Sequence, residues 1–267
     1  MKKNGIALYS LALGTVVLAM AGCGGSKPES TENAPAPAAN APAGKAVDSA
    51  TAGEVTGTVK LDGMPPKMKG INMAAEPACA KARTSPAVSE EVVTGDGGAL
   101  ANVIVYVKSG AEGYSFPPPS GPGKIDQQGC QYHPHVLALQ VGQDLQVVNS
   151  DQTTHNIHPT PMDNREWNES QPPGAAPIVK SFPRAEIAIP VKCNVHPWMK
   201  AYIAVIPSPY FQVTAKDGAF DLKNLPPGNY TLVAWHESYH TIEQTVTVGP
   251  KESKSVTFTF KATAPAD

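Results

Sequence analysis

The sequence predicts an all-β protein, and three observations lead to that fold class. Segments that alternate apolar and polar residues recur along the chain, which is typical of strands with one buried face. Turn signals separate these segments, among them Asp62-Gly63, Asp217-Gly218 and Pro226-Pro227-Gly228. Helix signals are nearly absent, and the 27 proline and 23 glycine residues interrupt any longer pattern. We therefore expect β-sandwiches.

The candidate strands follow one another from residue 54 to residue 261. In chain order they are Glu54–Leu61, Val103–Lys108, His135–Val141, Leu145–Asn149, Glu186–Val191, Ala201–Ile206, Phe211–Ala215, Ala219–Leu222, Asn229–Trp235, Gln244–Val248 and Ser255–Lys261.

These strands fall into three blocks. The block 117–207 contains most of the residues that carry chemistry, and the block 208–262 predicts a second, smaller sandwich with a hairpin closed at Asp217-Gly218. The strands of the block 54–116 either extend the middle block or pair with the last one. We prefer the second arrangement, which makes the middle block an insertion.

The first 22 residues predict a targeting segment rather than part of the fold. Lys2 and Lys3 precede an apolar stretch that is too short for a comfortable membrane span. The sequence Met20-Ala21-Gly22-Cys23 then resembles a bacterial lipoprotein signal, which is cleaved before a cysteine that receives lipid. We expect residues 1–22 to be removed and Cys23 to be lipidated. An ordinary secretory signal cut near the same place is the alternative.

Residues 23–53 predict a tether between that lipid and the fold. They are rich in alanine, proline, serine and asparagine, a composition that cannot bury a core. We expect the protein to be exported and lipid-anchored to the cell membrane or outer membrane, facing the periplasm or the cell exterior. Residues 263–267 predict a short tail. The formal net charge of −2 argues against nucleic-acid binding.

One loop brings together residue types that bind copper. The segment Cys193-Asn-Val-His196-Pro-Trp-Met199 places a thiolate, an imidazole and a thioether close together. A blue-copper site uses two histidines and a cysteine in a plane, with methionine as a weak axial ligand. His155, at the end of a strand-like run, is the candidate for the second histidine. We therefore predict one copper bound by His155, Cys193, His196 and Met199. Ordinary packing of these side chains is the alternative.

The cysteine count supports this assignment. The four cysteines are Cys23, Cys79, Cys130 and Cys193, so lipidation of the first leaves an odd number in an exported protein. Cys193 has metal-ligand neighbours, whereas Cys79 and Cys130 do not. We expect a Cys79–Cys130 disulfide. A Cys130–Cys193 disulfide is the alternative and would abolish the copper site.

The middle block resembles the cupredoxins, and the amicyanin type most closely, through its short ligand loop. The matching segments are His135–Gly142, Val147–Asp151, His155-Asn156 and Cys193–Val205. The resemblance implies a Greek-key β-sandwich with copper at one end. It also implies that Asn156 ties the His155 segment to the Cys193 loop by a hydrogen bond.

The last block resembles the carboxypeptidase regulatory-like module, a transthyretin-like sandwich. The resemblance is carried by the turn-and-strand pattern from Thr214 to Leu232. It implies an accessory β module and no peptidase activity.

Several other side chains are candidates for a second metal site. His133 and His135 form a His-x-His pair, His158 follows the proposed ligand His155, and His236 precedes Glu237 at the end of a strand. The alternative is that these histidines are hydrogen-bonded side chains at strand ends.

The leading functional hypothesis is a membrane-tethered type 1 copper protein that carries single electrons between redox partners in the cell envelope. We expect a redox protein as partner, such as a cytochrome or a respiratory complex subunit. In multicopper oxidases and copper nitrite reductases, a histidine next to the cysteine ligand connects the blue copper to a second copper centre. Here Lys192 and Asn194 flank Cys193, so an enzyme with its own substrate is not expected. The alternatives are a copper-handling lipoprotein and a non-catalytic scaffold or adhesion module.

Overall fold

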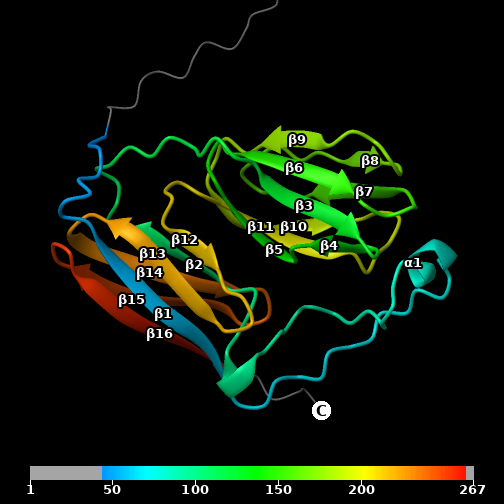
Figure 1. Cartoon of the computed structure of the whole chain (residues 1–267), viewed down its shortest axis with the longest axis horizontal. Helices are drawn as coiled ribbons and strands as arrows, with labels where there is room; N and C mark the ends of the chain where they lie inside the picture. Colours follow the sequence, from blue (N-terminus) through cyan, green and yellow to red (C-terminus); the bar gives the residue numbers. More distant parts are fainter. Residues whose placement is uncertain (1–43, 263–267) are drawn as a thin grey trace, which may run out of the picture. The chain divides into compact units, whose positions relative to one another are not determined.

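The computed structural model describes residues 44–262 and confirms the all-β prediction for that part of the chain. Its strands form four sheets, which pair into two sandwiches (Figure 1). The predicted signal peptide, the predicted lipidation site Cys23, residues 24–43 of the predicted tether and the tail lie outside the described residues. The prediction of a tether is wrong for residues 44–53, because the Lys45 N–H donates to the Gly113 carbonyl at 2.9 Å and a strand begins at Gly53. Within residues 44–262, no helix has the length and apolar character needed to cross a membrane.

The first sandwich uses strands from both ends of the described chain, and we call it the terminal sandwich. Its strands are β1 (Gly53–Asp62), β2 (Ile104–Ser109), β12 (Phe211–Val213), β13 (Ala219–Leu225), β14 (Gly228–His236), β15 (His240–Val248) and β16 (Ser253–Lys261). One sheet has the order β13-β1-β16 and the other β12-β2-β14-β15. In β1, Val55 and Val59 are fully buried and pack with Phe220 and Leu232. Each such side chain contributes about 1.5–3 kcal/mol by leaving water.

The second sandwich lies between these strands in the sequence, and we call it the central sandwich. Its strands are β3 (Gly123–Gln128), β4 (Gln131–His133), β5 (Val136–Gln140), β6 (Asp144–Asn149), β7 (His155–Pro159), β8 (Glu169–Gln171), β9 (Ile178–Ser181), β10 (Glu186–Lys192) and β11 (Lys200–Ile206). The sheets have the orders β5-β11-β10-β7-β8 and β4-β3-β6-β9. Ile125, Leu145, Ile157, Ile189 and Ile203 are fully buried in its core.

The strand pairing makes the central sandwich an insertion. β1 pairs with β13 and β16, and β2 pairs with β12 and β14, so the strands of residues 54–116 belong with the C-terminal block. Residues 54–116 also contribute to the central sandwich. Met73, Cys79 and Ala87 pack into the core of that sandwich, around the short helix α1 (Pro77–Lys81). The block 54–116 is therefore divided between the two sandwiches.

Parts of strands β2 and β11 are buried on both faces. Val105 of β2 packs in the core of the terminal sandwich, while its neighbour Ile104 packs with Ala204 and Ile206 of β11. This contact joins strands of the two sandwiches. It holds β11, the strand that follows the Cys193–Met199 loop, from two sides.

Every predicted strand is present, with ends that differ by a few residues, but β3, β4, β7, β8 and β9 were not predicted. These strands are short or polar, so they lack the alternation that marks the others. β7 is the clearest case, because His155 and Asn156 are polar and nevertheless buried. The helix α1 and a 3-10 turn at Asp96–Gly98 were also not predicted.

The expected hairpin at Asp217-Gly218 is wrong. β12 and β13 flank this turn but lie in different sheets, because β12 pairs with β2 and β13 pairs with β1. The turn therefore carries the chain from one sheet of the terminal sandwich to the other. Gly218 has a φ of 66°, and a Cβ there would lie 2.4 Å from the carbonyl oxygen of Val59. Both the backbone angle and the close approach require glycine.

We predict that Gly218→Ala destabilises the protein more than Gly97→Ala. Both glycines have a positive φ, at 66° and 63°, so both substitutions strain the backbone, at a cost of about 1–2 kcal/mol. Only the new Cβ at Gly218 meets a neighbouring backbone atom, whereas Gly97 has open space around it. Urea unfolding of the full chain measures both losses, and equal losses would contradict the prediction.

Candidate metal centre

The loop Cys193–Met199 connects two paired strands of the central sandwich. The antiparallel pairing of β10 with β11 continues to the residues immediately before and after the loop. Inside the loop, the Cys193 N–H donates to the Met199 carbonyl at 3.2 Å, and the Met199 N–H donates to the His196 carbonyl at 2.9 Å. The sheet and these bonds fix the loop backbone.

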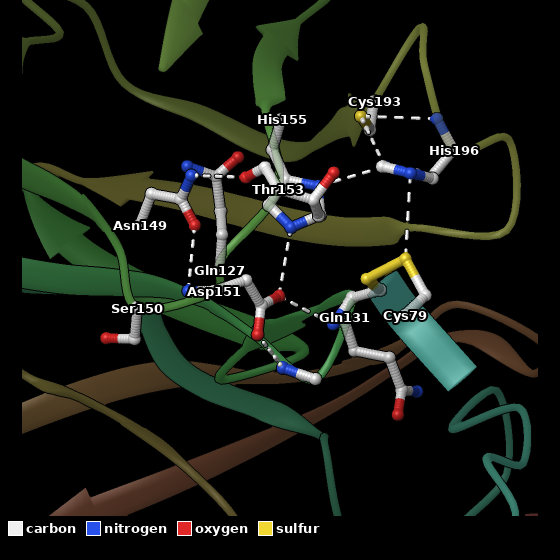
Figure 2. A network of polar contacts seen from close by, with 12 residues as sticks. Cys79, Gln127, Gln131, Asn149, Ser150, Asp151, Thr153, His155, Cys193 and His196 are labelled. Carbon is white, nitrogen blue, oxygen red and sulfur yellow. Dashed lines mark hydrogen bonds and ion pairs between the residues drawn. A yellow bond between two sulfur atoms is a disulfide. The ribbon is translucent and has the colours of Figure 1, made fainter. Parts of the chain in front are cut away.

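The start of β7 lies beside this loop, because β7 pairs with β10 through His158 and Lys192. The ligand atoms of His155, Cys193 and His196 lie within 4.8 Å of one another, and all three side chains are buried. The two Nδ1 atoms of His155 and His196 are 2.9 Å apart, and Cys193 Sγ lies 3.9 Å from His196 Nδ1 (Figure 2). The structure thus brings together three of the four predicted ligands.

Met199, the fourth predicted ligand, is fully buried in the same apolar cluster as Cys193. Its backbone closes the ligand loop, as described above. Its assignment as an axial ligand stays a prediction.

Asn156 links the two ligand-bearing segments. Its Oδ1 accepts the Asn194 N–H at 2.7 Å and the Cys193 thiol at 3.3 Å. Its Nδ2 donates to Asn168 Oδ1 at 2.7 Å, which fixes the orientation of the amide. This is the hydrogen bond that the cupredoxin resemblance implies.

A disulfide joins Cys79 of α1 to Cys130, and Cys193 is the free cysteine among the described residues. The disulfide lies against the ligand set, with Cys79 Sγ 3.6 Å from His196 Nε2 (Figure 2). The sequence indicated the bond without indicating this position. The helix α1 therefore covers one side of the site.

His196 is fully buried. The disulfide covers its Nε2, and the Trp198 ring lies next to it with centroids 5.2 Å apart. The indole N–H of Trp198 donates to the Cys130 carbonyl at 3.0 Å. In that segment Pro197 is exposed and Trp198 is partly exposed.

The surroundings of Cys193 favour its thiolate. Burial raises the pKa of the thiol, but hydrogen bonds from the His155 ring and from backbone N–H groups outweigh burial and lower the pKa below its usual value. Burial also lowers the pKa of His155, but the hydrogen bond and charge of Asp151 raise it overall. Burial and the charge of His155 lower the pKa of His196. A thiolate and a neutral imidazole are the forms that bind metals.

The other candidate histidines lie apart from this cluster. His158 pairs with Glu166, and the Nδ1 of the fully buried His236 accepts the Ser238 N–H at 3.1 Å. In the described part of the chain, each group of His, Cys, Asp and Glu side chains close enough to hold a metal includes His155 or His196. The second metal site therefore has no support from the geometry.

His135 instead forms a buried ion pair with Glu237, across the two sandwiches. Its other ring nitrogen, Nδ1, lies 3.2 Å from the Lys200 carbonyl. Burial would lower the pKa of His135, but the hydrogen bond and charge of Glu237 raise it above the usual 6.5. This pair is a structural contact next to the end of the ligand loop.

Two residues that contact the predicted ligands had no predicted role at the site. Asp151 lies 2.9 Å from His155 Nε2, and Cys79 touches His196. Asp151 is four residues before His155, but nothing in that spacing separates it from an ordinary turn residue. The contact of Cys79 depends on the packing of α1, which no local pattern indicates.

Comparison with known families matches only part of the chain. The model of the carboxypeptidase regulatory-like domain matches residues 197–261. That range begins inside the ligand loop and includes β11, which pairs within the central sandwich, but it lacks β1 and β2 of the terminal sandwich. No curated protein matches this chain.

Similar solved structures include cupredoxins and a copper enzyme. A mutant of amicyanin in its Cu(I) form is 18% identical, with a TM-score of 0.28, and the match covers 38% of this chain and 97% of amicyanin. A purple cupredoxin from Nitrosopumilus maritimus is 19% identical, with a TM-score of 0.27, covering 31% of this chain and 98% of that protein. A copper-containing nitrite reductase from Thermus scotoductus is 18% identical, with a TM-score of 0.30, covering 33% of this chain and 25% of the reductase. This chain thus spans a quarter of the reductase.

We predict that Cys79→Ser/Cys130→Ser lowers the free energy of unfolding of the metal-free protein by about 2–5 kcal/mol. The disulfide closes a long loop, since its cysteines are 51 residues apart, and removing it frees the unfolded chain. Urea unfolding of the full chain measures the loss. Reduced wild-type protein should unfold at nearly the same urea concentration as the double variant. The same midpoint for the oxidised wild type and the variant would contradict the prediction.

We predict that the His135–Glu237 pair stabilises the metal-free protein in a pH-dependent way. Because the folded-state pKa of His135 is raised, its contribution is fully present below about pH 6.5 and is lost as the pH rises through the folded value. The stability difference between wild type and Glu237→Gln should therefore shrink with rising pH. Urea unfolding at several pH values measures it. Glu243→Gln, on the exposed Lys108–Glu243 pair, is the control without a histidine. A difference for Glu237→Gln that is independent of pH would contradict the prediction.

Proposed function

We propose that this protein is a mononuclear type 1 copper protein that carries single electrons. The observation that carries the proposal is the buried cluster of His155, Cys193 and His196, whose ligand atoms lie within 4.8 Å of one another. One thiolate and two imidazoles are the equatorial donors of a blue-copper site, and copper heads the affinity series of divalent metals for such donors. Copper bound there would supply a one-electron couple between Cu(II) and Cu(I).

The chain's own contribution is to hold the donors in one arrangement. His155 is anchored by β7, and Cys193 and His196 are anchored by the loop between β10 and β11. Asn156 and the His196 N–H, which donates to Cys193 Sγ at 3.4 Å, limit movement of the sulfur. A fixed donor set supports fast electron exchange, because little has to move when the charge of the site changes.

The route for electrons to a partner passes through covered side chains. His196 itself is buried, but it touches Trp198 and the Cys79–Cys130 disulfide. Trp198 is partly exposed and follows the exposed Pro197. We propose that a partner docks at this segment and exchanges electrons by way of Trp198.

The alternative functions fit these features less well. A copper-handling protein must give up its metal, whereas these ligands are buried under α1 and a disulfide. An enzyme of the nitrite reductase type would need a link to a second metal centre, and Cys193 is flanked by Lys192 and Asn194 rather than histidine. A scaffold or adhesion module would leave the ligand cluster without a role.

The location and partner belong to the same proposal. We propose that lipid on Cys23 anchors the protein to an envelope membrane and that residues 24–43 let the fold reach its partner. The partner is a redox protein such as a cytochrome or a subunit of a respiratory complex.

We predict that the full chain loaded with Cu(II) shows an intense visible thiolate-to-copper absorption that disappears on reduction and returns on oxidation. Cys193→Ser should abolish this absorption, because the band arises from the thiolate. His155→Ala should weaken or abolish it. His240→Ala is the control, since His240 is exposed at the start of β15 in the terminal sandwich, and it should leave the spectrum unchanged.

Two results would contradict this proposal. An unchanged spectrum in Cys193→Ser would refute the ligand assignment. Colourless wild-type protein that nevertheless retains copper would favour the copper-handling alternative.

A further inference from the structure

Asp151 lies on the side of His155 that faces away from Cys193 (Figure 2). Asp151 is only 6% exposed, and its Oδ2 lies 2.9 Å from His155 Nε2. The same Oδ2 accepts the Cys130 N–H at 2.8 Å, and Oδ1 accepts the Gly129 N–H at 2.7 Å. One carboxylate therefore contacts a proposed metal ligand and the backbone of a disulfide cysteine.

The loop between β6 and β7 fixes the position of this carboxylate. Asn149 Oδ1 accepts the Asp151 N–H at 3.0 Å. Asn149 Nδ2 donates to the carbonyls of Thr153 at 2.9 Å and Gln171 at 2.8 Å. Because Asn149 ties down both sides of the loop, Asp151 is held toward His155 rather than toward solvent.

The chemistry of a carboxylate decides how His155 carries its proton. An ionised carboxylate accepts hydrogen bonds and cannot donate one, so Nε2 of His155 must donate to Asp151. In a neutral imidazole the other nitrogen, Nδ1, then keeps its lone pair. That nitrogen is the one that faces His196 Nδ1 in the ligand cluster.

We propose that Asp151 is a positioning residue for the metal centre, which keeps the His155 proton on Nε2 and directs the Nδ1 lone pair at the metal. The inference rests on the proposed metal site. A hydrogen-bonded carboxylate also makes the imidazole a stronger donor. The negative charge of Asp151 stabilises Cu(II) more than Cu(I). Asp151 therefore lowers the reduction potential of bound copper relative to a neutral residue at this position.

The same contacts give the disulfide a second role. Cys130 is held by Asp151 through its N–H, and its partner Cys79 touches His196 Nε2. The outer nitrogens of both proposed histidine ligands are thus occupied by one connected set of groups. Asp151 and the disulfide together hold the two imidazoles at their Nε2 atoms.

The test compares Asp151→Asn with Glu186→Gln in the full chain. Glu186 is the matched control, because its carboxylate accepts the N–H groups of Met162, Asp163 and Asn164 in the same sandwich and contacts no histidine. Zn(II) serves as a colourless probe that binds nitrogen and sulfur donors. We expect Zn(II) affinity to fall about 10–100-fold in Asp151→Asn and to stay unchanged in Glu186→Gln. In the copper-loaded protein, Asp151→Asn should raise the reduction potential.

A measurement on the wild type needs no variant and covers the case in which Asp151→Asn fails to fold. Nitrogen-15 NMR of the Zn(II)-loaded protein identifies which ring nitrogen of His155 carries the proton. A proton on Nε2 supports the inference, and a proton on Nδ1 overturns it.

The remaining outcomes separate this inference from the proposed function. In one outcome, wild type and Asp151→Asn bind Zn(II) equally well and their bound copper has the same reduction potential. Asp151 then has no positioning role, and the metal site stands. If wild type binds neither Zn(II) nor copper, the metal site is refuted, and this inference is refuted with it.

Discussion

The antiparallel pairing of β7 with β10 joins two regions of the chain that each carry part of the donor set. Two residue pairs, Val191 with Pro159 and Lys192 with His158, set the register. A slip by one residue would turn His155 to the other face of the sheet, away from Cys193. Asn156 reinforces this register by accepting the Asn194 N–H from across the pair. The ligand cluster, its burial and its hydrogen bonds all depend on this register.

Around that pairing, the site is closed by groups that are remote in sequence. The disulfide brings α1 over His196, and Asp151 covers the outer nitrogen of His155. Burial by itself would disfavour a thiolate, but the hydrogen bonds that reach Cys193 outweigh that cost. The site therefore combines burial of the three side chains with hydrogen bonds that favour the thiolate of Cys193.

The insertion of one sandwich into the other has a consequence for the ligand loop. β11 leaves the loop and is buried on both faces, by the core of the central sandwich and by Ile104 of β2. The buried His135–Glu237 pair adds a polar contact between the sandwiches near Lys200. The terminal sandwich thus supports the strand that follows Met199.

The sequence by itself determined the all-β class, the strands with clear alternation, and the Cys193–Met199 loop, because these depend on residues close together in the chain. It also indicated His155 and the Cys79–Cys130 disulfide, through residue type and the cysteine count. Only the tertiary structure decided that polar β7 is a buried strand, that the disulfide touches His196 and that Asp151 contacts His155. Those features depend on contacts between distant segments, and each involves a polar group whose burial is stable only when a partner from elsewhere in the fold satisfies its hydrogen bonds.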